Sequence, residues 1–156
     1  MHNDNAIMLY EANGAKLQKG ATHNVFSPNN QKVSRIRSVN IEYRITDATK
    51  VDENNKFWSI NYFWPGDKKS LNPSKDLIFE KTPKGESHQS SNIVERLIEF
   101  EVKDSRIELT ESEPVQLLLD EDSPRNWEGI VRFENEGFLI ATDKHPRMIL
   151  SFVPFD

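Results

Sequence analysis

The sequence contains no cysteine, which excludes disulfide bonds, thiolate catalysis and cysteine-ligated zinc sites. It also has no excess of basic residues, because the formal net charge is −5. Nucleic-acid-binding proteins usually carry a basic field, so we expect no nucleic-acid partner. No stretch approaches the ~20 consecutive apolar residues of a transmembrane helix, and we expect no membrane span.

Several functional signatures are missing as well. The chain has no glycine-rich phosphate loop, no GxSxG nucleophile motif and no HExxH zinc motif. Its first residues lack the basic start and apolar run of a secretory signal. We therefore expect a soluble chain, while its localisation and redox compartment stay open.

Helical periodicity is almost absent, and short apolar runs dominate instead. At 156 residues, of which 36% are hydrophobic, the chain is long enough for a single domain with a real core. The runs predict an all-β fold, although residues 94–102 could instead form a short helix. The expected strands are residues 6–10, 33–39, 41–45, 49–51, 57–63, 94–102, 106–109, 115–119, 129–133, 138–142 and 148–153.

Two stretches are typical of loops. Residues 18–31 are rich in Asn, Gly, Ser and Thr, and residues 65–91 contain three prolines with many lysines and serines. The second stretch exceeds the usual length of a loop in a compact domain. We expect both to be flexible insertions. The alternating charges of residues 94–113 predict a solvated outer face.

A repeat appears when Asp47 is laid on Glu128, an offset of 128 − 47 = 81 residues. "DATKVDENNKFWSINYF" then runs without a gap over "EGIVRFENEGFLIATDK". Each copy has an acidic residue, a short strand, a polar turn and a strand that begins with an aromatic residue, which together predict a β-hairpin. Two further strands lie between the copies, so one unit is a four-stranded antiparallel meander.

A recurring four-stranded meander is the signature of a β-propeller blade. The chain would hold one complete blade and parts of two others, whereas a propeller typically needs four to eight blades. A β-sandwich with one accidental hairpin likeness is the alternative. A partial propeller needs either its missing blades from a larger protein or self-association to cover its exposed sheet edges.

Several motifs carry a resemblance to a known family: "EANGAK" at 11–16, "YRITDAT" at 43–49, "FWSINYFWPGD" at 57–67, "RNWEGI" at 125–130 and "GFLIATDKHPRMILSFVP" at 137–154. Together they resemble the C-terminal blades of bacterial phytase-like or esterase-like propellers, which are often exported. This resemblance implies an intact protein that hydrolyses phosphoester, ester or lactone bonds. It also implies that the chain is a C-terminal part or a truncated reading frame.

In such a propeller, the acidic residues of the repeat would converge on one rim of the central channel. Calcium prefers 6–8 oxygen ligands, and we expect it to be the cofactor of such a site. The candidate ligands are Glu11, Asp47, Asn61, Glu128 and Asp143. Because carboxylates that lie close together repel one another, a metal or a basic group is the natural counterpart. Each residue could equally be an ordinary turn former.

Basic and aromatic residues beside this rim supply candidates for substrate binding. Lys16, Lys144 and Arg147 could receive an anionic small-molecule substrate, and Trp64 could line the mouth of the channel. His145 could act as a catalytic general acid or base near neutral pH, although a loop histidine without function is the simpler interpretation. Phe57 is expected to pack between blades.

Two functions from different classes remain. The first is a calcium-dependent hydrolase in which Asp47, Glu128 and Asp143 hold the metal that activates a water molecule. The second is a non-catalytic module that binds a ligand or another protein. A calcium titration separates them, because only the first function requires a metal.

Overall fold

The computed structural model describes residues 4–119, 124–143 and 147–155. In these described residues, eleven β-strands make up most of the regular structure, and the helices are short. The all-β class expected from the sequence is therefore confirmed. The strands form a curled eight-stranded sheet and a separate three-stranded sheet.

The N-terminal strands form an antiparallel meander. It contains β1 (Ala6–Met8), β2 (Thr22–Ser27) and β3 (Lys32–Ser38), in that spatial order. The presence of β2 corrects the expectation that residues 18–31 form a loop. Its core-facing residues, His23 and Val25, alternate with Thr22, Asn24 and Phe26, and the surrounding Asn, Ser and Thr residues hide this short alternation.

A second meander follows, as the repeat predicts. It consists of β4 (Arg44–Ala48), β5 (Lys56–Phe63), β6 (Val94–Lys103) and β7 (Arg106–Leu109), each antiparallel to the next. The expected strand at residues 41–45 begins only at Arg44, and residues 49–51 form none. The short β8 (Val115–Gln116) pairs with β6. Residues 94–102 are strand rather than helix.

The two meanders join through a short parallel pairing of β3 with β7. It covers the pairs Arg37–Arg106 and Ser38–Ile107. The combined sheet runs in the order β1-β2-β3-β7-β6-β5-β4 and curls so far that residues of its two end strands line one groove. An isolated bridge between Ala12 and Arg44 joins the chain after β1 to the start of β4.

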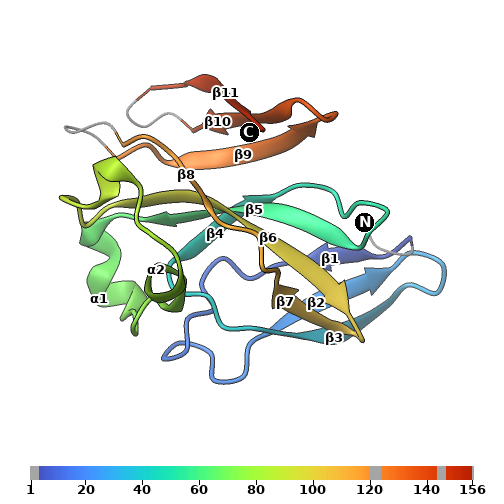
Figure 1. Cartoon of the computed structure of the whole chain (residues 1–156). Helices are drawn as coiled ribbons and strands as arrows, with labels where there is room; N and C mark the ends of the chain where they lie inside the picture. Colours follow the sequence, from blue (N-terminus) through green and yellow to red (C-terminus); the bar gives the residue numbers. More distant parts are fainter. Residues whose placement is uncertain (1–3, 120–123, 144–146, 156) are drawn as a thin grey trace.

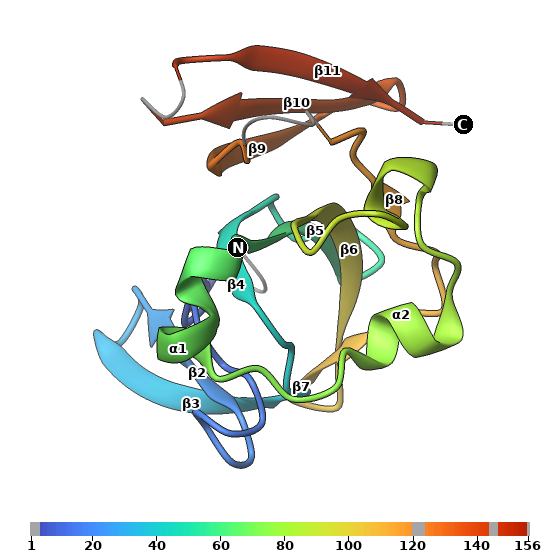
Figure 2. The ribbon, with the colours of Figure 1, turned by 90° about the vertical axis from the view of Figure 1, so that its left-hand side faces the viewer.

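The three-stranded sheet consists of β9 (Trp127–Phe133), β10 (Gly137–Thr142) and β11 (Leu150–Pro154). Its strands pair in sequence order, and it forms a separate layer beside β4 and β5 in both views (Figures 1 and 2). The molecule therefore has two sheets, and we distinguish three layers in them: β1–β3 and β4–β7, which are the two halves of the curled sheet joined by the β3–β7 pairing, and the separate sheet β9–β11.

The core lies on both faces of the middle layer, because alternate residues of a strand point to opposite faces. Phe57, Ile98 and Phe100 pack in one buried cluster with residues of β3 and β7. Ile60 and Leu97 pack in a second buried cluster, which includes residues of β9 and β10. This two-sided burial explains why β5 carries apolar residues on both faces, whereas in β6 the apolar residues are interrupted by Glu95, Arg96, Glu99 and Glu101. Phe57 is buried, as expected of a packing residue, and its neighbours in the first cluster belong to the same curled sheet.

The long insertion contains four short helical segments. They are η1 (Pro65–Asp67), α1 (Lys68–Leu71), α2 (Leu77–Lys81) and η2 (Glu86–His88). Leu71 and His88 are buried, and Asp76 caps the N-terminus of α2 by accepting a hydrogen bond from the Ile78 N–H. Residues 65–91, expected to be a flexible loop, thus carry local helical structure that is anchored to the sheet.

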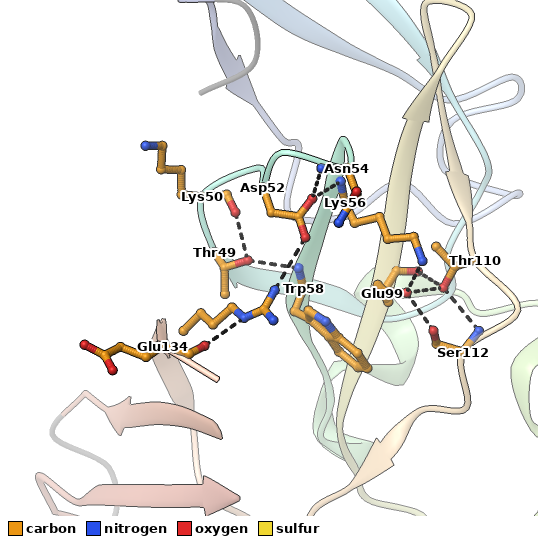
Figure 3. A network of polar contacts seen from close by, with 11 residues as sticks. Thr49, Lys50, Asp52, Asn54, Lys56, Trp58, Glu99, Thr110, Ser112 and Glu134 are labelled. Atoms are coloured by element: carbon orange, nitrogen blue, oxygen red, sulfur yellow. Dashed lines mark hydrogen bonds and ion pairs between the residues drawn. The ribbon is translucent and has the colours of Figure 1, made fainter. Parts of the chain in front are cut away.

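Polar contacts at the β4–β5 turn fix the hairpin and link it to the last layer (Figure 3). The Asp52 carboxylate accepts hydrogen bonds from the N–H groups of Asn54 and Lys56, at 2.8 and 2.9 Å. Its other oxygen lies 3.4 Å from the guanidinium of Arg132 on β9. Asp52 therefore stabilises its own turn and also holds β9 against the middle layer.

Candidate functional site

The first residue of β4, Arg44, lies at the centre of a polar cluster. Its guanidinium forms ion pairs with Glu11, with Asp67 at 3.8 Å and with Glu128 at 3.6 Å. It also donates a hydrogen bond to the side-chain oxygen of Asn126 at 3.4 Å. We call these five residues the Arg44 cluster. Three carboxylates from different layers thus surround one cation.

Each of these three carboxylates belongs to a residue that lies near the end of a strand. Glu11 follows β1, and its carbonyl accepts a hydrogen bond from the Ile45 N–H at 2.7 Å. Asp67 ends the η1 segment just after β5, and Glu128 lies near the start of β9. Residues near the ends of β1, β5 and β9 therefore meet at one rim.

Both hairpins of the repeat have a register shift beside this rim. Between the pairs Ile45–Asn61 and Ala48–Ser59, two residues of β4 oppose one residue of β5. In the last layer, Thr142 pairs with Trp127 and Ala141 pairs with Gly129, so that Glu128 is the extra residue. Such bulges redirect side chains and strengthen the local twist. The same irregularity in both hairpins is a structural counterpart of the sequence repeat.

The charges of the Arg44 cluster are partly balanced by the protein itself. Arginine stays protonated in proteins, so Arg44 offsets one of the three negative charges. The guanidinium also lies over the Tyr62 ring, 5.7 Å from its centroid. Burial raises the pKa of Tyr62 to about 12; nearby carboxylates act in the same direction, and the Arg44 guanidinium acts against them. Tyr62 therefore remains a neutral hydroxyl at physiological pH.

The five predicted calcium ligands have different surroundings. Glu11 and Glu128 meet at Arg44, and Asp143 lies close to them because its N–H donates to the carbonyl of Asn126. Asp47 lies further along β4, where its carboxylate accepts a hydrogen bond from the Ile130 N–H. Asn61 does not face the rim at all, because it is fully buried.

The side-chain amide of Asn61 makes its hydrogen bonds inside the protein. Its nitrogen donates to the carbonyls of Glu42 and Arg44, and its oxygen accepts from the Arg96 guanidinium at 2.8 Å. No group of three or more His, Cys, Asp or Glu side chains with metal-ligand geometry occurs among the described residues. In the described parts of the chain, the basic counterpart of the rim carboxylates is Arg44.

The predicted substrate-binding residues are not assembled into one site. Lys16 is exposed, and its ammonium donates to the carbonyl of Pro73 at 3.3 Å. Trp64 is partly exposed at the start of η1, and Arg147 is exposed beyond β10. Among the described residues, no hydrogen bond or ion pair joins these three side chains. Lys144 and His145 lie outside the described residues.

Sequence reasoning missed the polar groups buried behind the rim. Glu95 and Arg96, expected on a solvated face, are both fully buried. The Arg96 guanidinium pairs with Asp76 at 3.0 Å and lies over the Phe79 ring. Glu95 accepts hydrogen bonds from the side chains of Arg125 and Trp127. These contacts attach the long insertion and the segment before β9 to the middle layer.

Comparisons with known proteins return no match: no family model, curated protein or solved structure is similar to the chain at a significant level. The resemblance to phytase-like or esterase-like propellers therefore stays an expectation that rests on the quoted motifs. Among the helices of the described residues, none has the length and apolar character needed to cross a membrane.

Proposed function

We propose that this chain is a non-catalytic protein-binding module built as part of a β-propeller. The observation that carries the proposal is the contact between β4 and β9, the first strands of two successive meanders. Thr46 donates its hydroxyl to the carbonyl of Trp127, and the Asp47 carboxylate accepts from the Ile130 N–H at 2.8 Å. In a propeller, the first strands of neighbouring blades lie side by side around the central channel.

The layer order supports the same arrangement. The two halves of the curled sheet and the three-stranded sheet follow one another in sequence; one hydrophobic cluster joins the two halves, and a second lies between β5–β6 and β9–β10. The parallel β3–β7 pairing is not part of an ideal propeller, because neighbouring blades pack face to face. It covers only two residue pairs and joins strands far from β4 in the sheet order.

Arg44 favours a binding role over metal-dependent catalysis. A calcium ion at the rim would have to compete with a guanidinium that already contacts Glu11, Asp67 and Glu128. The exposed apolar side chains on β9 and β11 favour protein binding instead, since contiguous apolar patches mark protein-binding surfaces.

The test is a thermal-denaturation titration with calcium on the wild-type chain and on Arg44→Gln. For a module without metal, millimolar calcium leaves the melting temperature of the wild-type chain unchanged. Removal of the guanidinium leaves three carboxylates without their counter-charge, so Arg44→Gln is expected to gain a calcium-dependent stabilisation. A calcium-dependent shift in the wild-type chain that Glu128→Gln abolishes would overturn the non-catalytic assignment.

A second candidate is the calcium-dependent phosphoester, ester or lactone hydrolase suggested by the family resemblance. The observation in its favour is that carboxylates from three layers meet at one rim, with Asp143 close by. This candidate requires calcium-dependent hydrolysis of a chromogenic ester or phosphoester. Loss of that activity in Glu128→Gln, with an unchanged free energy of unfolding, would support it over the binding module.

A further inference from the structure

A groove separates the two end strands of the curled sheet. Among the strands of the described residues, β1 pairs with β2 alone and β4 pairs with β5 alone, so that apart from the Ala12–Arg44 bridge their other edges are unpaired and border the same groove. The chain closes this gap at one end, where Ala12 bridges to Arg44. Beyond the bridge lies a groove of about 360 Å³.

The lining of the groove suits an extended apolar segment. Ile7 and Leu9 come from the β1 side, Ile45 and Ala48 come from β4, and Phe57 lies on β5. Asp47 and Lys50 add one charge of each sign. An open strand edge beside an apolar groove can accept an added strand, in which backbone hydrogen bonds give affinity and alternate side chains give specificity.

The position of β1 in the fold indicates which kind of strand belongs there. Glu11 follows β1, Asp67 follows β5 and Asp143 follows β10, and these three acidic residues all lie at or beside the Arg44 cluster. β1 therefore corresponds to β5 and β10, the second strands of their layers. β5 has β4 as its inner neighbour and β10 has β9, whereas the inner edge of β1 faces the groove.

We propose that the groove between β1 and β4 binds an extended strand supplied by another polypeptide. The bound segment runs antiparallel to β1 and has apolar or β-branched residues at alternate positions, as "GIVRF" has in β9. A second copy of this chain is not suited to supply it, because the inner strands β4 and β9 are already paired with β5 and β10. This inference rests on the proposed binding module and specifies its partner.

The probe is a blocked synthetic peptide with the sequence "NWEGIVRFE" (residues 126–134), added to the isotopically labelled full chain. Binding is followed by amide chemical shifts and by hydrogen exchange. We expect shift changes at Ala6–Met8 and at Ala48, together with slower exchange of the β1 edge amides. Backbone pairing predicts that a peptide with Val131→Pro, which lacks one N–H donor, binds at least about tenfold more weakly.

Two variants of the chain complete the experiment. Ala48→Arg places a long side chain in the groove and is expected to weaken binding, whereas Val33→Arg changes an exposed residue of β3 outside the groove and serves as the matched control. Unchanged amide spectra show that each variant folds.

Three results would reject the groove as a strand-binding site: no shifts at about 1 mM peptide, shifts confined to β9–β11, or equal binding of the proline peptide. Broadening that grows with chain concentration in the absence of peptide and is confined to the signals of β1 and β4, rather than of β9 and β11, would identify a second copy as the occupant and overturn the proposed source. The calcium response of Arg44→Gln is read at the other end of the groove. The calcium response can therefore be observed even if the peptide does not bind. In that case the proposed binding module stands, and only the strand-binding groove is rejected.

Discussion

The carboxylate of Asp47 on β4 accepts a hydrogen bond from the backbone N–H of Ile130 on β9, at 2.8 Å. The two residues lie 83 positions apart in the sequence and belong to the two hairpins of the repeat. The acidic residue that heads the first hairpin therefore has a structural partner in the second. Asp47 therefore links the inner strands β4 and β9.

Replacement of Asp47 should loosen the last layer. Asp47→Ala removes a charge-assisted hydrogen bond and leaves the half-buried Ile130 N–H with a poorer partner, so we expect a loss of ~1–3 kcal/mol in the free energy of unfolding. Urea denaturation measures this loss. Asp143→Ala is the matched control, because the Asp143 side chain is exposed and its contact to Asn126 uses backbone atoms. Equal stability of the two variants would contradict a structural role for Asp47.

The hairpins could be predicted because the sequence signals for their strands and turns lie close together along the chain. Alternating or continuous apolar residues, the polar turns and the aromatic start of β5 and β10 lie within short windows. β2 was missed because only His23 and Val25 point to the core, within a stretch of turn-forming residues. The parallel pairing of Arg37 with Arg106 was missed because it depends on tertiary contact and has no local signal.

The site could be predicted only in part. The sequence suggested that acidic residues would need a cationic counterpart at the rim, and Glu11 and Glu128 do meet there. Arg44 escaped notice because charged residues at strand ends are common and do not reveal their partners. Glu95 and Arg96 were placed on a solvated face because a charge pattern cannot distinguish an exposed strand from one covered by an insertion.

The buried pair of Arg96 and Asp76 should be sensitive to the loss of one partner. Arg96→Met leaves the Asp76 carboxylate, whose side chain is only 9% exposed, without its cation. We expect a loss of ~3–5 kcal/mol in the free energy of unfolding. The double variant Arg96→Met with Asp76→Asn removes the unpaired charge as well and should recover part of that loss. Denaturant titration measures the free energy of unfolding of both variants. If Arg96→Met alone were more stable than the double variant, Asp76 would not depend on Arg96 as its counter-charge.

His23 should make the fold sensitive to acid. It is buried, its Nδ1 atom accepts a hydrogen bond from the Tyr10 N–H, and burial lowers its pKa from 6.5 to about 4. The unfolded chain takes up a proton as the pH falls through 6.5, whereas the folded chain resists protonation until about pH 4. The contribution of neutral His23 is therefore present above pH 6.5 and declines toward pH 4, by about 3 kcal/mol at most.

The His23→Asn variant isolates this effect. The asparagine side-chain oxygen can take over the acceptor role of Nδ1 toward the Tyr10 N–H, but asparagine does not titrate. We expect the difference in unfolding free energy between pH 7 and pH 4.5 to become smaller in His23→Asn than in the wild-type chain. Burial also lowers the pKa of His88, so some acid sensitivity should persist in the variant. An unchanged pH dependence would exclude His23 as its source.

The outer face of the last layer should drive association. Val131, Phe133, Leu150 and Phe152 are between 46% and 73% exposed, and they lie on β9 and β11 on either side of β10. Such a contiguous apolar surface is unfavourable in water and is typical of an interface. We expect analytical ultracentrifugation to detect concentration-dependent association that Leu150→Glu weakens with little change in stability. Leu118→Glu, at an equally exposed position outside this face, should associate as the wild-type chain does. A wild-type chain that stays monomeric at high concentration would show that this face does not associate with itself.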